Sequence, residues 1–115
     1  MIWTLTQVAL GGAIGSALRF VTVAFVGAPL AVLLVNVLGS FAMGMACVAL
    51  SARLSPLVMT GVLGGFTTFS AFSLDALRLW EAGQGAQAAL YVAASVVLSL
   101  GAVALGAALA RGIWV

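Results

Sequence analysis

Two phenylalanines in the third apolar segment are the residues whose type and spacing best suit contact with a small ion. Residues 64–72 read GGFTTFSAF, so Phe69 and Phe72 stand three positions apart and lie on one face of a helix. The edge of a phenyl ring is partially positive, which favours contact with an anion. Phenylalanine in a membrane helix is most often a packing residue. Here the paired rings, the flanking hydroxyls and the two glycines together indicate a narrow anion passage.

The residues that precede the rings predict a break in that helix. Gly64, Gly65, Thr67 and Thr68 are poor helix formers together, and glycine permits a non-helical backbone. Carbonyl groups freed at membrane depth must be buried in protein or satisfied by water or an ion. We therefore expect the third membrane helix to be broken between Gly64 and Thr67.

Polar side chains in two other apolar segments add hydrogen-bond donors. Asn36 lies in mid-segment, with Ser40 one turn further on the same face. A buried carboxamide is costly without a partner, so Asn36 fits an interhelical hydrogen bond, the commoner use, or a pore-lining donor. Tyr91, Ser95 and Ser99 form one stripe along a helix. These hydroxyls either donate to an anion or bond to the carbonyls of their own helix.

Arg19 is the charged residue deepest in an apolar segment. Its guanidinium must snorkel to the membrane surface or reach an aqueous cavity, where it would attract anions. The two acids, Asp75 and Glu81, fall near the end of the third segment or beyond it. No titratable group is therefore expected in mid-membrane, which disfavours a proton-driven pump.

The composition identifies a membrane protein. Of 115 residues, 65% are hydrophobic and the net charge is +2, whereas about a quarter of the residues of a soluble domain are charged. The sequence has no basic patch of the kind that binds nucleic acid. The lone Cys47 can form no disulfide within the chain and indicates no metal site. No acid, base and nucleophile constellation is present, so we expect no enzyme. The N-terminus has no positive region and is expected to be a retained span.

Four segments have the length of a membrane helix, and we expect an all-α membrane protein with one domain. Their expected ranges are residues 3–26, 30–51, 57–79 and 86–110. An even number of spans places both termini and the second loop on one side, with Arg53 and Arg111. The other side has Arg78 alone. This arginine bias is too small to fix one orientation, so the chain is expected to insert both ways.

Small residues four positions apart are typical of close helix contacts in membranes. Close packing within the chain and a subunit interface fit them equally well. The pairs are Gly11 with Gly15, Gly12 with Ser16, Ser40 with Gly44, Gly61 with Gly65, and Ala102 with Gly106.

The segments GGAIGSALRF, NVLGS and GGFTTFSAFSLD together resemble the motifs of the small fluoride channels, the Fluc family, also called CrcB proteins. The third is similar to the family signature GGxTTFSTF followed by Ser-x-Glu. The resemblance runs through all four spans. It implies an antiparallel, dual-topology homodimer in a prokaryotic inner membrane, with two pores that export fluoride by passive efflux.

The resemblance also assigns residues. It implies that Phe69 and Phe72 contact fluoride, that Arg19 lies in a vestibule, and that backbone carbonyls of Gly64 and Thr67 bind a structural sodium ion at the dimer centre. It further implies a polar pore lining made by Asn36, Ser40, Ser70, Tyr91, Ser95 and Ser99.

Two positions depart from the family pattern. Ala71 stands where threonine is usual, so one hydroxyl beside the pore is missing, and Asp75 replaces glutamate. The first change suggests lower conductance or a second homologue as partner. Two other functions are open: a small multidrug exporter, which requires a carboxylate in the first span, and a membrane assembly subunit that transports nothing.

Overall fold

Four helices long and apolar enough to cross a membrane run through residues 1–114, the part of the chain that the computed structural model describes. The third of them is interrupted, so the four spans comprise six helical elements. These are α1 (Ile2–Val26), α2 (Leu30–Ala49), the π-helix η1 (Pro56–Leu63), α3 (Gly64–Phe66), α4 (Phe69–Glu81) and α5 (Gly85–Trp114). The expected all-helical membrane protein with four spans is confirmed.

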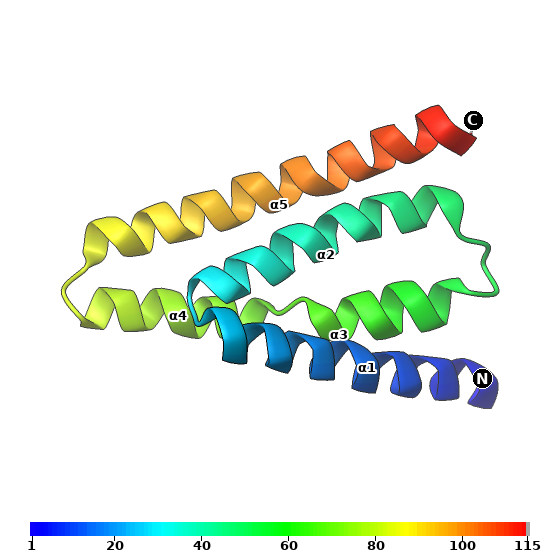
Figure 1. The fold of residues 1–115 in the computed structure, drawn as a ribbon, viewed down its shortest axis with the longest axis horizontal. Helices are drawn as coiled ribbons and strands as arrows, with labels where there is room; N and C mark the ends of the chain where they lie inside the picture. Colours follow the sequence, from blue (N-terminus) through cyan, green and yellow to red (C-terminus); the bar gives the residue numbers. More distant parts are fainter. Residues whose placement is uncertain (115) are drawn as a thin grey trace.

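The helices pack as two main pairs that share the interrupted span. α2 lies along α5, whereas α1 lies along η1 and α3, and α4 packs on α5. Both termini and the loop of residues 51–55 lie at one end of the molecule, and the α1–α2 and α4–α5 turns lie toward the other (Figure 1). The break in the third span therefore falls inside the bundle, facing α2 and α5.

Glycines bring α1 into backbone contact with the third span. A Cβ atom on Gly11 would lie 2.8 Å from the Cα atom of Gly61, and one on Gly65 would lie 2.7 Å from the Gly12 carbonyl oxygen. Gly44 makes the same kind of contact between α2 and the backbone of α5. These glycines therefore pack helices within one chain, as small residues commonly do in membranes.

The predicted helix break is confirmed, but its residues are the threonines. Thr67 (φ −84°, ψ 156°) and Thr68 (φ −152°, ψ 122°) are extended, whereas Gly64 is helical (φ −63°, ψ −37°). β-Branched residues favour extended backbone. The glycine at position 65 is needed instead for the close approach of α1.

The buried apolar core is small and lies between α2, α4 and α5. It consists of Val32, Phe72 and Tyr91, with partly buried apolar residues packed around it. Many large apolar side chains are exposed instead, among them Phe20 and Phe25 of α1. An apolar exterior of this kind is what a helix bundle presents to lipid.

Candidate functional site

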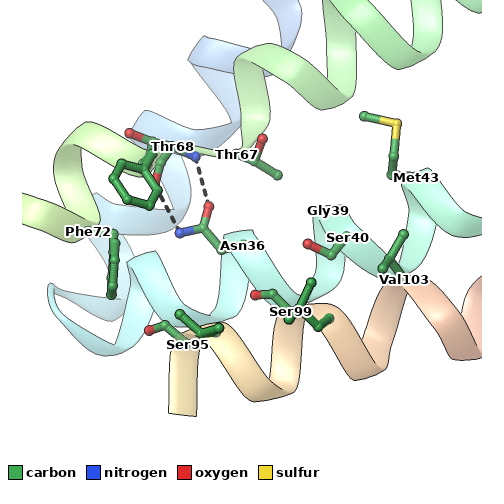
Figure 2. Close-up of a pocket in the computed structure, with 13 residues that line it drawn as sticks. Asn36, Gly39, Ser40, Met43, Thr67, Thr68, Phe72, Ser95, Ser99 and Val103 are labelled. Atoms are coloured by element: carbon green, nitrogen blue, oxygen red, sulfur yellow. Dashed lines mark hydrogen bonds between the residues drawn. The ribbon is translucent and has the colours of Figure 1, made fainter. Parts of the chain in front are cut away.

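Asn36 of α2 joins the helix break to the rest of the bundle. Its Nδ2 donates to the Thr68 carbonyl oxygen over 3.0 Å, and its Oδ1 accepts from the Thr68 N–H over 2.8 Å (Figure 2). One carboxamide thus satisfies both backbone groups of an extended residue at membrane depth. The interhelical hydrogen bond weighed for Asn36 is present, and its side chain also lines a groove.

The helix break leaves two backbone carbonyls without their usual helical donors. In a continuous helix the Thr68 N–H would donate to the Gly64 carbonyl oxygen, but here it donates to Asn36 Oδ1. The Ala71 N–H would bond to the Thr67 carbonyl, but donates to Thr68 Oγ1 over 3.1 Å. Gly64 and Thr67 therefore offer neutral oxygen atoms of the kind that unwound membrane helices present to sodium ions.

The break also places a helix N-terminus inside the bundle. Thr68 is the N-cap of α4, and its Oγ1 lies 3.3 Å from Ser70 Oγ. The first N–H groups of a helix have no intrahelical acceptor, and the helix dipole makes this end positive. The start of α4 therefore favours a nearby anion without a charged side chain.

A groove of about 440 Å³ runs along the break, between α2, α4 and α5 (Figure 2). None of the 13 residues that line it is charged. Its polar lining consists of carboxamide and hydroxyl groups from all three sides. They belong to Asn36, Ser40, Thr67, Thr68, Ser95 and Ser99. The groove is thus suited to an ion that is held by hydrogen bonds.

Phe69 and Phe72 line the same groove. Their ring centroids are 5.4 Å apart and their planes meet at 62°, so that one ring presents its edge to the other. Phe72 is 8% exposed, whereas Phe69 is 77% exposed on the surface of the chain. The two rings therefore differ in role, since one is fixed in the core and the other projects outward.

The hydroxyl stripe of α5 divides into two parts. Ser95 and Ser99 line the groove, and Ser95 Oγ is buried without a hydrogen-bond partner within the described residues. A buried hydroxyl without a hydrogen-bond partner is costly, so the Ser95 hydroxyl is suited to bond to a ligand or a water molecule in the groove. Tyr91 lies beyond the groove and donates to Asp75 Oδ2 over 3.4 Å.

A second pocket, of about 390 Å³, lies between α1 and α4 and is lined by three charged residues, Arg19, Asp75 and Arg78. Arg19 lines it and donates from Nε to the Gly65 carbonyl oxygen over 3.1 Å. Asp75 is also here and is only 7% exposed, so the chain does bury a carboxyl within the third span. Ala71 lines this pocket and not the groove. The hydroxyl absent at position 71 is therefore missing from the pocket that Arg19 also lines, and not from the groove.

Two residues were not predicted from the sequence to contribute side chains or close contacts to the site, although Thr68 was counted among the residues of the break. Thr68 caps α4, accepts a hydrogen bond from Asn36 Nδ2 at its carbonyl oxygen, and donates one from its N–H to Asn36 Oδ1. Gly39 lies against the Thr67 side chain, and a Cβ there would strike the Thr67 methyl group. A threonine just before an apolar helix is a recognisable N-cap signal. The Gly39 contact joins distant parts of the chain and has no local signal.

Comparison with known proteins assigns the chain to a family. The family model "CrcB-like protein, Camphor Resistance (CrcB)" matches residues 6–107. A protein of Ruegeria sp. (strain TM1040) is 53% identical over 125 aligned positions, with 98% of each chain covered. One of Paracoccus denitrificans (strain Pd 1222) is 49% identical, over 96% of this chain and 97% of its own. One of Jannaschia sp. (strain CCS1) is 60% identical, over 75% and 86%. All three are named fluoride-specific ion channel FluC.

Proposed function

Because the chain belongs to the CrcB-like protein family, we propose that it is a fluoride-selective ion channel that lowers cytoplasmic fluoride by passive efflux. It is a multi-pass protein of the bacterial inner membrane and not an enzyme, in keeping with the names of its relatives. The observation that carries the proposal is the uncharged, donor-lined groove at the helix break.

The groove offers replacements for the water that fluoride must shed. A small anion loses a large hydration free energy on entering a narrow passage, so the passage must supply donors in its place. Ser95 Oγ is buried and has no hydrogen-bond partner in the part of the chain that the structure describes, and Asn36 retains a second Nδ2 hydrogen beyond the one given to Thr68. The ring edges of Phe69 and Phe72 and the start of α4 add partial positive charge.

The absence of charge along the groove suits conduction. A full positive charge would bind fluoride too strongly for rapid release, whereas several weak sites allow an ion to enter and leave. None of the lining residues is charged. A membrane potential that is negative inside then drives the anion outward, and the selection of fluoride over chloride follows from width and hydrogen-bond geometry. Arg19, in the pocket between α1 and α4, would attract anions to a vestibule.

We further propose that two chains associate antiparallel and form two pores. One support is the exposed Phe69 ring, which completes no passage within a single chain. Another is the arginine distribution, two at one end against one at the other, which fixes orientation weakly. On this proposal Ser40, Ser70, Tyr91 and Ser99 extend the polar path from the rings toward the membrane surfaces.

The carbonyls of Gly64 and Thr67 fit a structural sodium ion. Both have lost their helical donors, and neutral oxygen ligands suit hard cations. Two carbonyls from one chain are too few to hold such an ion, whereas a two-fold axis would double them. When bound, the ion would supply positive charge that neutralises the carbonyl dipoles and joins the two breaks.

The proposal is tested by anion efflux from liposomes that contain the purified protein, with valinomycin present so that potassium balances the charge. We expect rapid release of fluoride and no release of chloride. Phe72→Ala should sharply reduce the release. Absence of fluoride release from the chain alone, and also from the chain co-expressed with a homologue, would overturn the proposal.

One observation bears on a proton-coupled transporter. Asp75 is buried, but it lies in the pocket between α1 and α4 and not in the groove. In the same liposomes, a channel should release fluoride at a rate set by the membrane potential, and an imposed proton gradient alone should drive no uptake. A gradient-driven uptake abolished by Asp75→Asn would favour coupling instead.

A further inference from the structure

A pocket at the end of the molecule that carries both termini is separate from the groove and from the helix break. It has a volume of about 530 Å³ and is formed by the first turns of α1, the loop of residues 51–55 and the start of η1. This volume is within the range of small-molecule sites in proteins. Nothing in the proposed ion path uses this pocket.

One part of the pocket is apolar. Leu10 of α1, Leu57 of η1 and Leu54 of the loop contribute to its walls. Trp3, which also lines the pocket, is 67% exposed in the first turn of α1. Tryptophan near the end of a membrane helix is typical of the headgroup level. The pocket therefore extends from the headgroup region along the leucines.

The rim of the pocket is polar and held in place. Arg53 and Ser51 line it from the loop. Gln7, which is 7% exposed, donates from Nε2 to the Arg53 carbonyl oxygen over 3.2 Å. The Ser51 carbonyl accepts from the Leu54 and Ser55 N–H groups. The loop backbone is thus fixed before any ligand arrives, and fixed loops bind with less loss of entropy.

The charged side chains at this end of the molecule, within residues 1–114, are of one sign. The two acidic residues of the chain, Asp75 and Glu81, both belong to α4, which runs toward the opposite end (Figure 1). Arg53 belongs to the loop of residues 51–55 and Arg111 to the last turn of α5, and this loop and this end of α5 lie at the end with the termini (Figure 1). Within residues 1–114, no acidic side chain lies at this end to neutralise the guanidinium on the rim. This guanidinium suits an external anion such as a phosphate, which arginine binds in a bidentate way.

We propose that this pocket binds an anionic phospholipid. One acyl chain lies against the leucines, and the headgroup phosphate lies at the Arg53 guanidinium and the Ser51 hydroxyl. The lipid covers the loop and holds the start of α1 to η1. This proposal does not depend on which ion the groove carries.

The test measures lipid retention by native mass spectrometry of the purified full chain in detergent, titrated with phosphatidylglycerol or phosphatidylcholine. Arg53→Gln removes the phosphate contact. Arg111→Gln is the matched control, because Arg111 is exposed at the same end and does not line the pocket. Leu54→Trp fills the pocket from the exposed loop and leaves Arg53 in place. Elution in size-exclusion chromatography checks that each variant keeps the assembly of the wild type.

We expect the wild type to retain phosphatidylglycerol more strongly than phosphatidylcholine. Arg53→Gln should weaken retention about fivefold, the change expected for one basic side chain near an anionic surface. Leu54→Trp should weaken it for both lipids, and Arg111→Gln should change it less than twofold. Addition of inorganic phosphate should displace no lipid, because phosphate lacks the acyl chain.

Three results would overturn the proposal. Equal losses in Arg53→Gln and Arg111→Gln would indicate a general attraction of positive charge to the lipid. Displacement of lipid by inorganic phosphate would indicate a site for the free anion. Unchanged retention in Arg53→Gln and Leu54→Trp, with altered elution, would indicate that a second copy of the chain covers the pocket.

Discussion

The two halves of the third span are built from different residues for different purposes. Before the break, η1 and α3 meet α1 through backbone, and Gly61 and Gly65 leave no room for a Cβ. After the break, α4 packs on α5 with side chains and presents Phe69 and Phe72 to the groove. The first half fixes the position of the span by shape, and this allows the second half to expose polar and aromatic groups that would otherwise be costly in a membrane.

Asn36 is the residue that holds the junction between these halves. It comes from α2, which contacts both, and it bonds to the N–H and the carbonyl of Thr68. The difference between the two halves of the third span thus predicts three kinds of mutant phenotype. Damage to the junction should affect both stability and flux, damage to the first half mainly stability, and damage to the groove mainly flux.

The largest effect is expected for Asn36→Ala. It leaves two backbone groups without partners at membrane depth, at a cost of about 1–3 kcal/mol for each group. The extended conformation at Thr68 should then be lost, and fluoride efflux from liposomes should fall at least about a hundredfold. Thermal unfolding in detergent, followed by size-exclusion chromatography, should show a lower midpoint.

Ser40→Ala is the matched control, since Ser40 lies one turn along α2 in the same groove and has no bond to the break. It should lower efflux with little change in the unfolding midpoint. If Asn36→Ala instead kept the wild-type midpoint and lost only efflux, Asn36 would be a pore donor alone and not the junction.

The next largest effect is expected where α1 contacts the first half of the third span. Substitutions of two adjacent glycines in α1 test this contact. Gly11→Ala places a methyl group 2.8 Å from the Gly61 Cα atom, and neither backbone can move freely. Overpacking of this kind costs about 1–3 kcal/mol. A Cβ on Gly12 meets nothing within 4 Å, so Gly12→Ala should unfold close to wild type. Equal midpoints for the two variants would contradict the packing of α1 on η1.

The fold was predictable from composition and segment length, because a membrane permits few architectures. The four spans and the broken third helix required no tertiary information. The choice of threonines for the break was not predictable in the same way. Local propensity makes Gly64 and Gly65 the weaker helix formers, but contact with α1 uses Gly65 in a helical conformation. Tertiary packing thus decided between two local candidates.

The candidate site was predictable as a set of residues and less so as a geometry. Periodicity placed Phe69 with Phe72 and Ser95 with Ser99, and these four line the groove. It also placed Tyr91 on the same stripe, whereas the structure pairs Tyr91 with Asp75. Bonds between distant segments, such as Asn36 with Thr68, leave no periodic trace in one sequence. The same holds for the burial of Asp75.

A third prediction tests how tightly the break is seated. Gly39→Ala drives a methyl group into the Thr67 methyl group, with an expected cost of about 1–2 kcal/mol and a reduced efflux. Thr67→Ser removes the methyl that is struck and keeps the hydroxyl, which donates to the Leu63 carbonyl oxygen. The double variant should recover most of the stability that Gly39→Ala loses. If the stability losses of the two single variants simply add in the double variant, the Thr67 side chain does not pack against Gly39.

The smallest change in structure should come from Ser95→Ala, which tests the groove alone. Among residues 1–114, Ser95 Oγ is buried without a hydrogen-bond partner, so its removal leaves no other group there unsatisfied and the unfolding midpoint should stay level or rise slightly. Efflux should nevertheless fall about tenfold, because a hydrogen bond to a charged group contributes about 1.5–3 kcal/mol. Ser73→Ala is the control, since Ser73 is exposed and bonds to the Phe69 carbonyl oxygen of its own helix. A Ser95→Ala variant that lost stability in proportion to its flux would show that the hydroxyl serves the fold. A loss of flux without a loss of stability would support the interpretation that the groove serves conduction. The Ser95 hydroxyl would then be a donor to the ion.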